Sequence, residues 1–180
     1  MATKNGGITE QKKSLADLIN RGGIYRDVQG NNPREVLSAL IGVLPPISSV
    51  SADKLLEAVL EREALMPTGI GRGIALPHPR NPLDAPDPSF PQEGQQNPLA
   101  DSEQFAVLAF LKEPVDWHSL DGEKVHILFL IVSASAKQHL QNLSEITFLC
   151  HQEDFCRLLN ERASQDRLLH FIREAEKDWN

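Results

Sequence analysis

The sequence predicts a single α/β domain in which helices cover both faces of a mixed β-sheet. Two runs, FAVLAFL at 105–111 and VHILFLIV at 125–132, are apolar on both alternating faces, which is typical of strands buried on both sides. Amphipathic helical patterns precede and follow these strands. A length of 180 residues with 41% hydrophobic content is enough for one domain with a sizeable core. Together these observations favour a layered α/β fold over residues 14–180.

The first third of the chain reads as helical after a flexible, polar tail at residues 1–13. Apolar residues within 15–19 predict a short helical turn that ends at Gly22-Gly23. A longer helix is expected to begin at Asn32-Pro33, because an N-cap side chain is followed there by proline at the first helical position. Pro45-Pro46 would stop that helix.

Further helices are expected on both sides of the two strands. One begins at Ser51, where Val50 and Leu55 are placed for a hydrophobic staple, and it carries Arg62 near its end. The last third of the chain is helical, with apolar stripes that the sequence places at helical spacing. The stripes are Leu140, Leu143, Ile146 and Leu149; then Phe155, Leu158 and Leu159; then Leu168, Leu169, Ile172 and Ala175.

Between these parts lies GIGRGIALPHPR, residues 69–80, which we interpret as a strand ending at His78. The composition then changes, because six of the twelve prolines of the chain fall between Pro79 and Pro98. Few apolar residues accompany them, so we expect a solvated insertion at about 79–104 rather than a packed element. We hypothesise that this segment is a flap that limits which protein can dock beside His78. The alternative is a tolerated insertion without function.

Charge and composition exclude several classes of function. A formal net charge of −7 argues against a nucleic-acid partner, which leaves a basic footprint. The polar opening of the chain lacks the apolar region of a signal peptide, and the longest apolar run, near 127–132, is too short to span a bilayer. Cys150 and Cys156 form neither a CxxC pair nor a disulfide framework. We therefore expect a cytoplasmic protein that is not integral to a membrane and needs no cofactor or metal.

His78 is the candidate reactive group. Much of an imidazole is neutral at pH 7, so its nitrogen can attack a phosphoryl group and hold it as a phosphoramidate. Pro77 and Pro79 restrict the backbone on both sides of it. The alternative is an ordinary loop histidine. The glycine run before it lacks the G-x-G-x-x-G spacing of a dinucleotide site.

The surrounding residues carry a family resemblance. Residues 63–78 are similar to the phosphohistidine motif of the fructose- and mannitol-type IIA domains. The matching positions are Glu63, then Ile70-Gly71 after six residues, then the run IALPH at 74–78 after two more. These domains belong to the bacterial phosphoenolpyruvate phosphotransferase system and include IIA-like nitrogen-regulatory proteins. The resemblance covers about residues 14–175 outside the proline-rich segment. It also includes Glu61-Arg62-Glu63, Thr68 to Gly71, His139-Leu140 and Leu143-Ser144.

The resemblance implies roles for three residues. His78 aligns with the phosphoryl acceptor, Arg62 with an arginine that pairs with phosphate oxygens, and His139 with a second histidine at the start of a helix capped by Ser133 or Ser135. We expect all three in one shallow surface cleft. The alternatives are a solvated helix end for Arg62 and a boundary histidine for His139. The family usually has a small residue where this chain has Pro79.

The implied function is a phosphoryl-carrier component that takes phosphate on His78 from a phosphohistidine carrier protein. Its partner downstream would be a transporter component or a regulatory protein. We expect no attached membrane domain or phosphocysteine domain, and on that expectation a nitrogen-type regulatory role is favoured over dedicated sugar uptake. A second hypothesis is a binding module whose phosphorylation only changes affinity for a transporter, kinase or transcription factor. A third, a metal site of His78, His118 and His139, lacks local ligand spacing.

Overall fold

The computed structural model describes residues 14–47, 50–80 and 103–179. The tail expected at residues 1–13 and most of the proline-rich insertion lie outside these residues. The elements, in chain order, are α1 (Leu15–Gly22), β1 (Ile24–Val28), α2 (Pro33–Ile41), α3 (Ala52–Leu65), β2 (Gly69–Gly71), β3 (Ile74–Ala75), β4 (Phe105–Val115), β5 (Val125–Val132), α4 (Ala136–His151), α5 (Glu153–Asn160) and α6 (Gln165–Lys177).

Within the described residues, five strands form one sheet in the order β1-β4-β5-β3-β2. β4 and β5 pair antiparallel in its centre, from Phe105 opposite Val132 to Val115 opposite Val125. β1 runs parallel to β4, β3 runs parallel to β5, and β2 is antiparallel to β3. The prediction of a mixed sheet is therefore confirmed.

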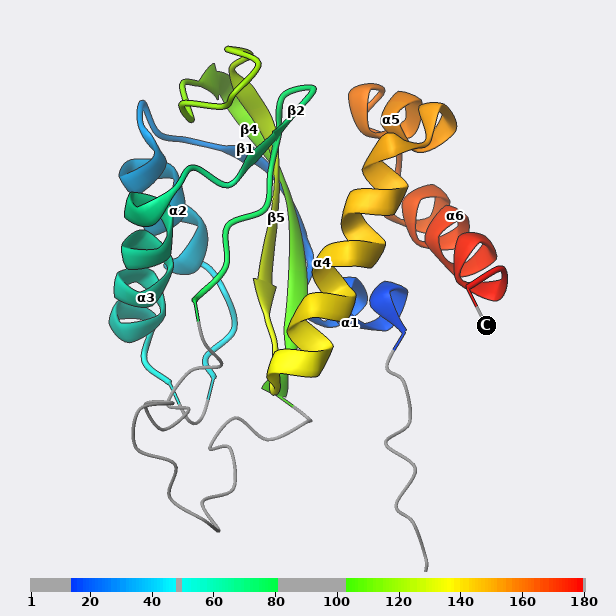
Figure 1. Ribbon diagram of the computed structural model, residues 1–180, viewed down its shortest axis with the longest axis horizontal. Helices are drawn as coiled ribbons and strands as arrows, with labels where there is room; N and C mark the ends of the chain where they lie inside the picture. The colour runs from blue at the N-terminus through cyan, green and yellow to red at the C-terminus, as the bar shows by residue number, and fades with distance from the viewer. Residues whose placement is uncertain (1–13, 48–49, 81–102, 180) are drawn as a thin grey trace, which may run out of the picture.

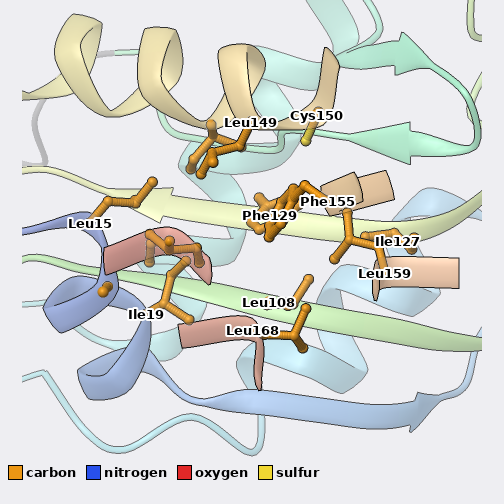
Figure 2. Packing of buried hydrophobic residues seen from close by; sticks show 14 of the residues in the cluster. Leu15, Ile19, Leu108, Ile127, Phe129, Leu149, Cys150, Phe155, Leu159 and Leu168 are labelled. Atoms are coloured by element: carbon orange, nitrogen blue, oxygen red, sulfur yellow. The ribbon is translucent and has the colours of Figure 1, made fainter. Parts of the chain in front are cut away.

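Helices cover both faces of the sheet, as the apolar strands predict (Figure 1). α2 and α3 lie on one face, and α1, α4, α5 and α6 lie on the other. Alternate residues of β4 enter separate cores: Leu108 joins the cluster under α1, α4, α5 and α6, whereas Val107 joins the cluster under α2 and α3. Figure 2 shows the first cluster, where Phe129 of β5 packs with Phe155 of α5 at a ring-centroid distance of 6.4 Å.

Side-chain caps explain where the long helices begin. The side chain of Asn32 accepts a hydrogen bond from the N–H of Glu35 (3.0 Å), and Pro33 opens α2, as predicted. Ser51 caps α3 in the same way. Val50 and Leu55 are both buried in the core under this helix, at the positions of the expected staple. α2 ends at Ile41, so the helix stops several residues before Pro45-Pro46, the expected end.

The glycine-rich stretch is a hairpin, so the prediction of one strand ending at His78 is wrong. β2 ends at Gly71, the chain turns, and β3 ends at Ala75. Gly71, Arg72 and Gly73 have φ values of 91°, 56° and 71°, and a strand cannot continue through this left-handed region. The N–H of Arg72 donates to a carboxylate oxygen of Asp121 (3.0 Å), which ties the turn to the β4–β5 connection.

One residue of the predicted α4 stripe is also misplaced. Leu140 is 69% exposed, whereas Ile146 and Leu149 are buried. The buried face of α4 includes the polar residues Asn142 and Glu145, which a search for apolar spacing passes over. At 3.6 residues per turn, Leu140 lies about 160° around the helix from Asn142, on the solvent side.

Candidate functional site

His78 lies just beyond β3, where the chain leaves the sheet. The N–H of Ile131 in β5 donates to the carbonyl of Pro77 (3.1 Å), so this irregular segment stays attached to the neighbouring strand. Pro77 and Pro79 are both buried. His78 itself is only 7% exposed. His78 is thus more enclosed than the shallow cleft expected from the sequence.

Both ring nitrogens of His78 have polar partners. Nδ1 lies 2.7 Å from the carbonyl oxygen of Leu76, and Nε2 lies 3.1 Å from Nε of Arg62. A carbonyl only accepts and a guanidinium N–H only donates. The ring is therefore neutral, with its proton on Nδ1 and its lone pair on Nε2. That lone pair makes Nε2 the nucleophilic atom.

Arg62 reaches His78 from the last turn of α3. Its Nη1 also donates to the carbonyl of Met66 (2.8 Å), in the loop that follows the helix. The neighbouring Glu63 accepts two hydrogen bonds from Thr68. Arg62 is directed at the imidazole, so the alternative of a solvated helix end paired with Glu61 or Glu63 does not describe this geometry.

His139 approaches from the opposite helix layer. It lies in the first turns of α4, which is capped by Ser135 rather than Ser133. Its ring centroid is 4.8 Å from that of His78, with the planes tilted by 56°. The amide of Asn142, one turn later, donates to the hydroxyl of Ser133 at the end of β5 (3.0 Å), and both groups are buried. This bond fixes the start of α4 against the sheet, which the sequence-based analysis did not predict.

The surroundings keep both histidines uncharged. Burial lowers the pKa of His78, the carbonyl of Leu76 opposes this by favouring the protonated ring, and the Arg62 cation lowers the pKa further. Burial first, then His78 and Arg62, lower the pKa of His139 to about 4. Two neutral imidazoles and one guanidinium thus converge at neutral pH. This set can attack an electrophile with Nε2 and stabilise anionic oxygens beside it.

The other histidines have separate surroundings. His118 is exposed and lies 3.3 Å from Asp116, His126 contacts Asn160, and His151 contacts the carbonyl of Thr147. Across residues 14–47, 50–80 and 103–179, no group of three His, Cys, Asp or Glu side chains is arranged to hold a metal ion. No helix in that part of the chain is long and apolar enough to cross a membrane.

Comparison with known proteins matches the chain to one family model. Residues 17–175 match the model described as phosphoenolpyruvate-dependent sugar phosphotransferase system, EIIA 2. The chain is 27% identical over 168 residues to the fructose-specific EIIABC component of Bacillus subtilis, covering 91% of this chain but only 24% of that protein. It is 26% identical over 154 residues to a nitrogen regulatory protein of Bradyrhizobium diazoefficiens, covering 84% of this chain and 88% of the relative.

A solved structure shows the same fold. The crystal structure of nitrogen regulatory protein IIA-Ntr from Neisseria meningitidis superposes with a TM-score of 0.70 at 21% sequence identity. The match covers 88% of this chain and 98% of that one. The arrangement of sheet and helices that brings Arg62, His78 and His139 together is therefore a known one.

Proposed function

Since the chain belongs to the EIIA 2 family of the phosphoenolpyruvate-dependent sugar phosphotransferase system, we propose that it carries a phosphoryl group on Nε2 of His78. The single observation that supports this most strongly is the pairing of both ring nitrogens. The carbonyl of Leu76 holds the proton on Nδ1, which leaves the Nε2 lone pair directed at Arg62. A nucleophile, Nε2 of His78, thus lies beside a cation, the Arg62 guanidinium, that can stabilise the phosphoryl oxygens.

The proposed transfer starts from the phosphohistidine of a carrier protein. Nε2 of His78 attacks phosphorus, the donor P–N bond breaks, and its electron pair returns to the donor imidazole. The His78 ring gains positive charge as the new bond forms, and the Nδ1–H bond to the Leu76 carbonyl stabilises that charge. Positioning and charge stabilisation supply most of the catalysis in such reactions.

The residues around His78 would act on the phosphoryl oxygens. Arg62 must release Nε2 before the attack, and its N–H groups can then pair with the oxygens. His139 is adjacent, with its ring centroid 4.8 Å from that of His78, so its ring N–H can donate a hydrogen bond to a phosphoryl oxygen. The first turn of α4 adds the positive end of a helix to the same place.

We assign this carrier a regulatory, nitrogen-type role in the cytoplasm rather than dedicated sugar uptake. This assignment rests on the similarity to the nitrogen regulatory protein, which extends over 84% of this chain. Its downstream partner would then be a regulatory protein or a separate transporter component. The test is incubation with phosphoenolpyruvate, the first enzyme of the system and the carrier protein. We expect one acid-labile phosphoryl group per chain, and none on His78→Ala; full labelling of His78→Ala would move the acceptor elsewhere.

A second candidate is a binding module in which phosphorylation only changes affinity for a partner. Exposed apolar side chains beside the site favour it: Leu65 and Met66 follow Arg62, and Leu140 follows His139, each more than 60% exposed. A dianionic group placed among them would alter their contact with a partner protein. If the phosphorylated protein never passes its phosphoryl group to a phosphotransferase component, but binds a regulatory partner differently, this candidate replaces the first.

A further inference from the structure

Glu63 and Thr68 form a clamp across the loop that follows α3. One carboxylate oxygen of Glu63 accepts the N–H of Thr68 (2.8 Å), and the other accepts its hydroxyl (2.6 Å). Thr68 is 6% exposed and Glu63 is partly buried. The two oxygens of one side chain thus hold Thr68 at two atoms, its N–H and its hydroxyl. This clamp therefore fixes the distance between the end of α3 and the start of β2.

The clamp continues by backbone hydrogen bonds to the imidazole. The carbonyl of Thr68 accepts the N–H of Leu76 (3.0 Å), and the carbonyl of Leu76 lies 2.7 Å from Nδ1 of His78. Thr68 thus orients the peptide unit that orients the ring. A shift of Thr68 would rotate the Leu76 carbonyl, which accepts the proton of Nδ1 and, together with the Arg62 donor at Nε2, sets the tautomer of the ring.

The same helix turn reaches the other side of the ring. Arg62, the residue before Glu63, donates from Nε to Nε2 of His78 (3.1 Å). Hydrogen bonds therefore connect Glu63 through Thr68, Leu76 and His78 to Arg62, and the peptide bond between Arg62 and Glu63 completes a ring of contacts. Because Arg62 and Glu63 are covalent neighbours, the clamp sets the position of Arg62 relative to the nitrogen that it faces.

We propose that Glu63 and Thr68 are positioning residues, which hold the Leu76 carbonyl on Nδ1 and thereby keep the lone pair of His78 on Nε2. They act through the backbone and do not touch the phosphoryl group. What matters is the geometry of the clamp and not the charge of Glu63, since an amide could accept the Thr68 N–H and donate to its hydroxyl. The consequence for rate rests on the proposed function; the consequence for the tautomer of His78 does not.

The test compares disruptive variants with conservative ones. Glu63→Ala and Thr68→Val remove the clamp, whereas Glu63→Gln and Thr68→Ser can keep it. Glu35→Gln is the matched control, because Glu35 is also a carboxylate that accepts hydrogen bonds, from Asn31 and Asn32, at the start of another helix. The first readout is the ¹⁵N chemical shifts of the His78 ring in the unphosphorylated protein. They report which nitrogen carries the proton and the pKa of the ring.

We expect the Nδ1–H form to dominate in the wild type, Glu63→Gln, Thr68→Ser and Glu35→Gln, and a mixture of tautomers in Glu63→Ala and Thr68→Val. In single-turnover phosphotransfer the two disruptive variants should be slowed roughly tenfold to a hundredfold, because small misplacements near reacting atoms cost about this much. KM for the carrier protein should change less than twofold, since Thr68 is buried and the Glu63 carboxylate is bonded to it.

Two results would overturn the proposal: wild-type tautomers and rates in both disruptive variants, or equal damage in Glu63→Gln and Glu63→Ala, which would make charge the important property. Thr68→Val conserves the shape of the side chain. If Glu63→Ala fails to fold, the tautomer and the rate of Thr68→Val therefore decide the proposal. If the wild type accepts no phosphoryl group, the proposed function fails, while the tautomer measurement still decides the role of the clamp.

Discussion

Nε of Arg62 donates a hydrogen bond to Nε2 of His78 across 3.1 Å, so a cation occupies the lone pair with which the imidazole would attack. In the proposed transfer, Arg62 would have to leave Nε2 before it could pair with the phosphoryl oxygens. Nη1 of Arg62 keeps its bond to the Met66 carbonyl in this state, which anchors the side chain near the site.

Arg62 should affect both the rate and the pKa of His78. We expect Arg62→Ala to slow phosphotransfer about a hundredfold or more, the usual cost of losing one donor that stabilises transition-state charge. Arg62→Lys should be intermediate, since an ammonium cannot bond two oxygens in the planar way of a guanidinium. Removing the cation should also raise the pKa of His78, because Arg62 lowers it. Single-turnover labelling and NMR titration measure the two effects; an unchanged pKa in Arg62→Ala would contradict the contact.

His139 should assist the transfer without being the acceptor. We expect His139→Ala to accept the same final amount of phosphoryl group as the wild type, at a rate lower by roughly a hundredfold. His139→Gln should recover part of the rate, because its amide can still donate a hydrogen bond. Time courses with radiolabelled donor separate the rate from the end point. A lower end point in His139→Ala would mean that the second histidine carries part of the phosphate.

The buried histidines should make the fold less stable in weak acid. His139 has a pKa of about 4 when folded and about 6.5 when unfolded, so the unfolded state binds more protons between these values. Its contribution to the free energy of unfolding is complete above pH 6.5 and is lost as the pH falls toward 4. We expect His139→Gln to reduce the loss between pH 7 and pH 5 by about 1–2 kcal/mol, allowing for partial exposure. Urea unfolding at both pH values measures this, and an equal loss in His139→Gln and the wild type would contradict the prediction.

The two faces of α4 should differ sharply in their tolerance of truncation. Ile146 is fully buried under the helix, and we expect Ile146→Ala to lower the free energy of unfolding by about 2–5 kcal/mol. Leu140 is 69% exposed, so Leu140→Ala should stay within about 0.5 kcal/mol of the wild type. Chemical denaturation of the two variants checks this, and equal losses would show that Leu140 is covered.

Local chemistry made much of this fold predictable from sequence. Asn32-Pro33 and Ser51 predict the starts of two helices. Two runs with apolar residues on both faces predict the central strands β4 and β5. The expectation that Arg62, His78 and His139 converge rested on the motif, and the structure brings the three side chains together. Their roles in phosphoryl transfer stay predictions.

The features that sequence reasoning missed depend on backbone geometry or on weak patterns. Alternating glycines look like a strand, yet Arg72 adopts a positive φ that non-glycine residues seldom take, and the chain turns there. β1 is a five-residue edge strand with exposed Arg26 and Asp27, so it offers little apolar alternation. The Leu76 acceptor is a carbonyl, which every residue has, so nothing in the sequence could have indicated it.

The candidate site draws one side chain from each of three layers. Arg62 belongs to the helix layer over one core, His78 to the segment that follows β3 in the middle layer, and His139 to the helix layer over the other core. Because the two cores share no residues, substitutions can accumulate in each of them independently. A small sliding of either layer would move one partner of His78 by a fraction of an ångström while leaving the reacting residues unaltered. Under the proposed function, divergence of the interior would therefore change the transfer rate during evolution without any change in the three residues themselves.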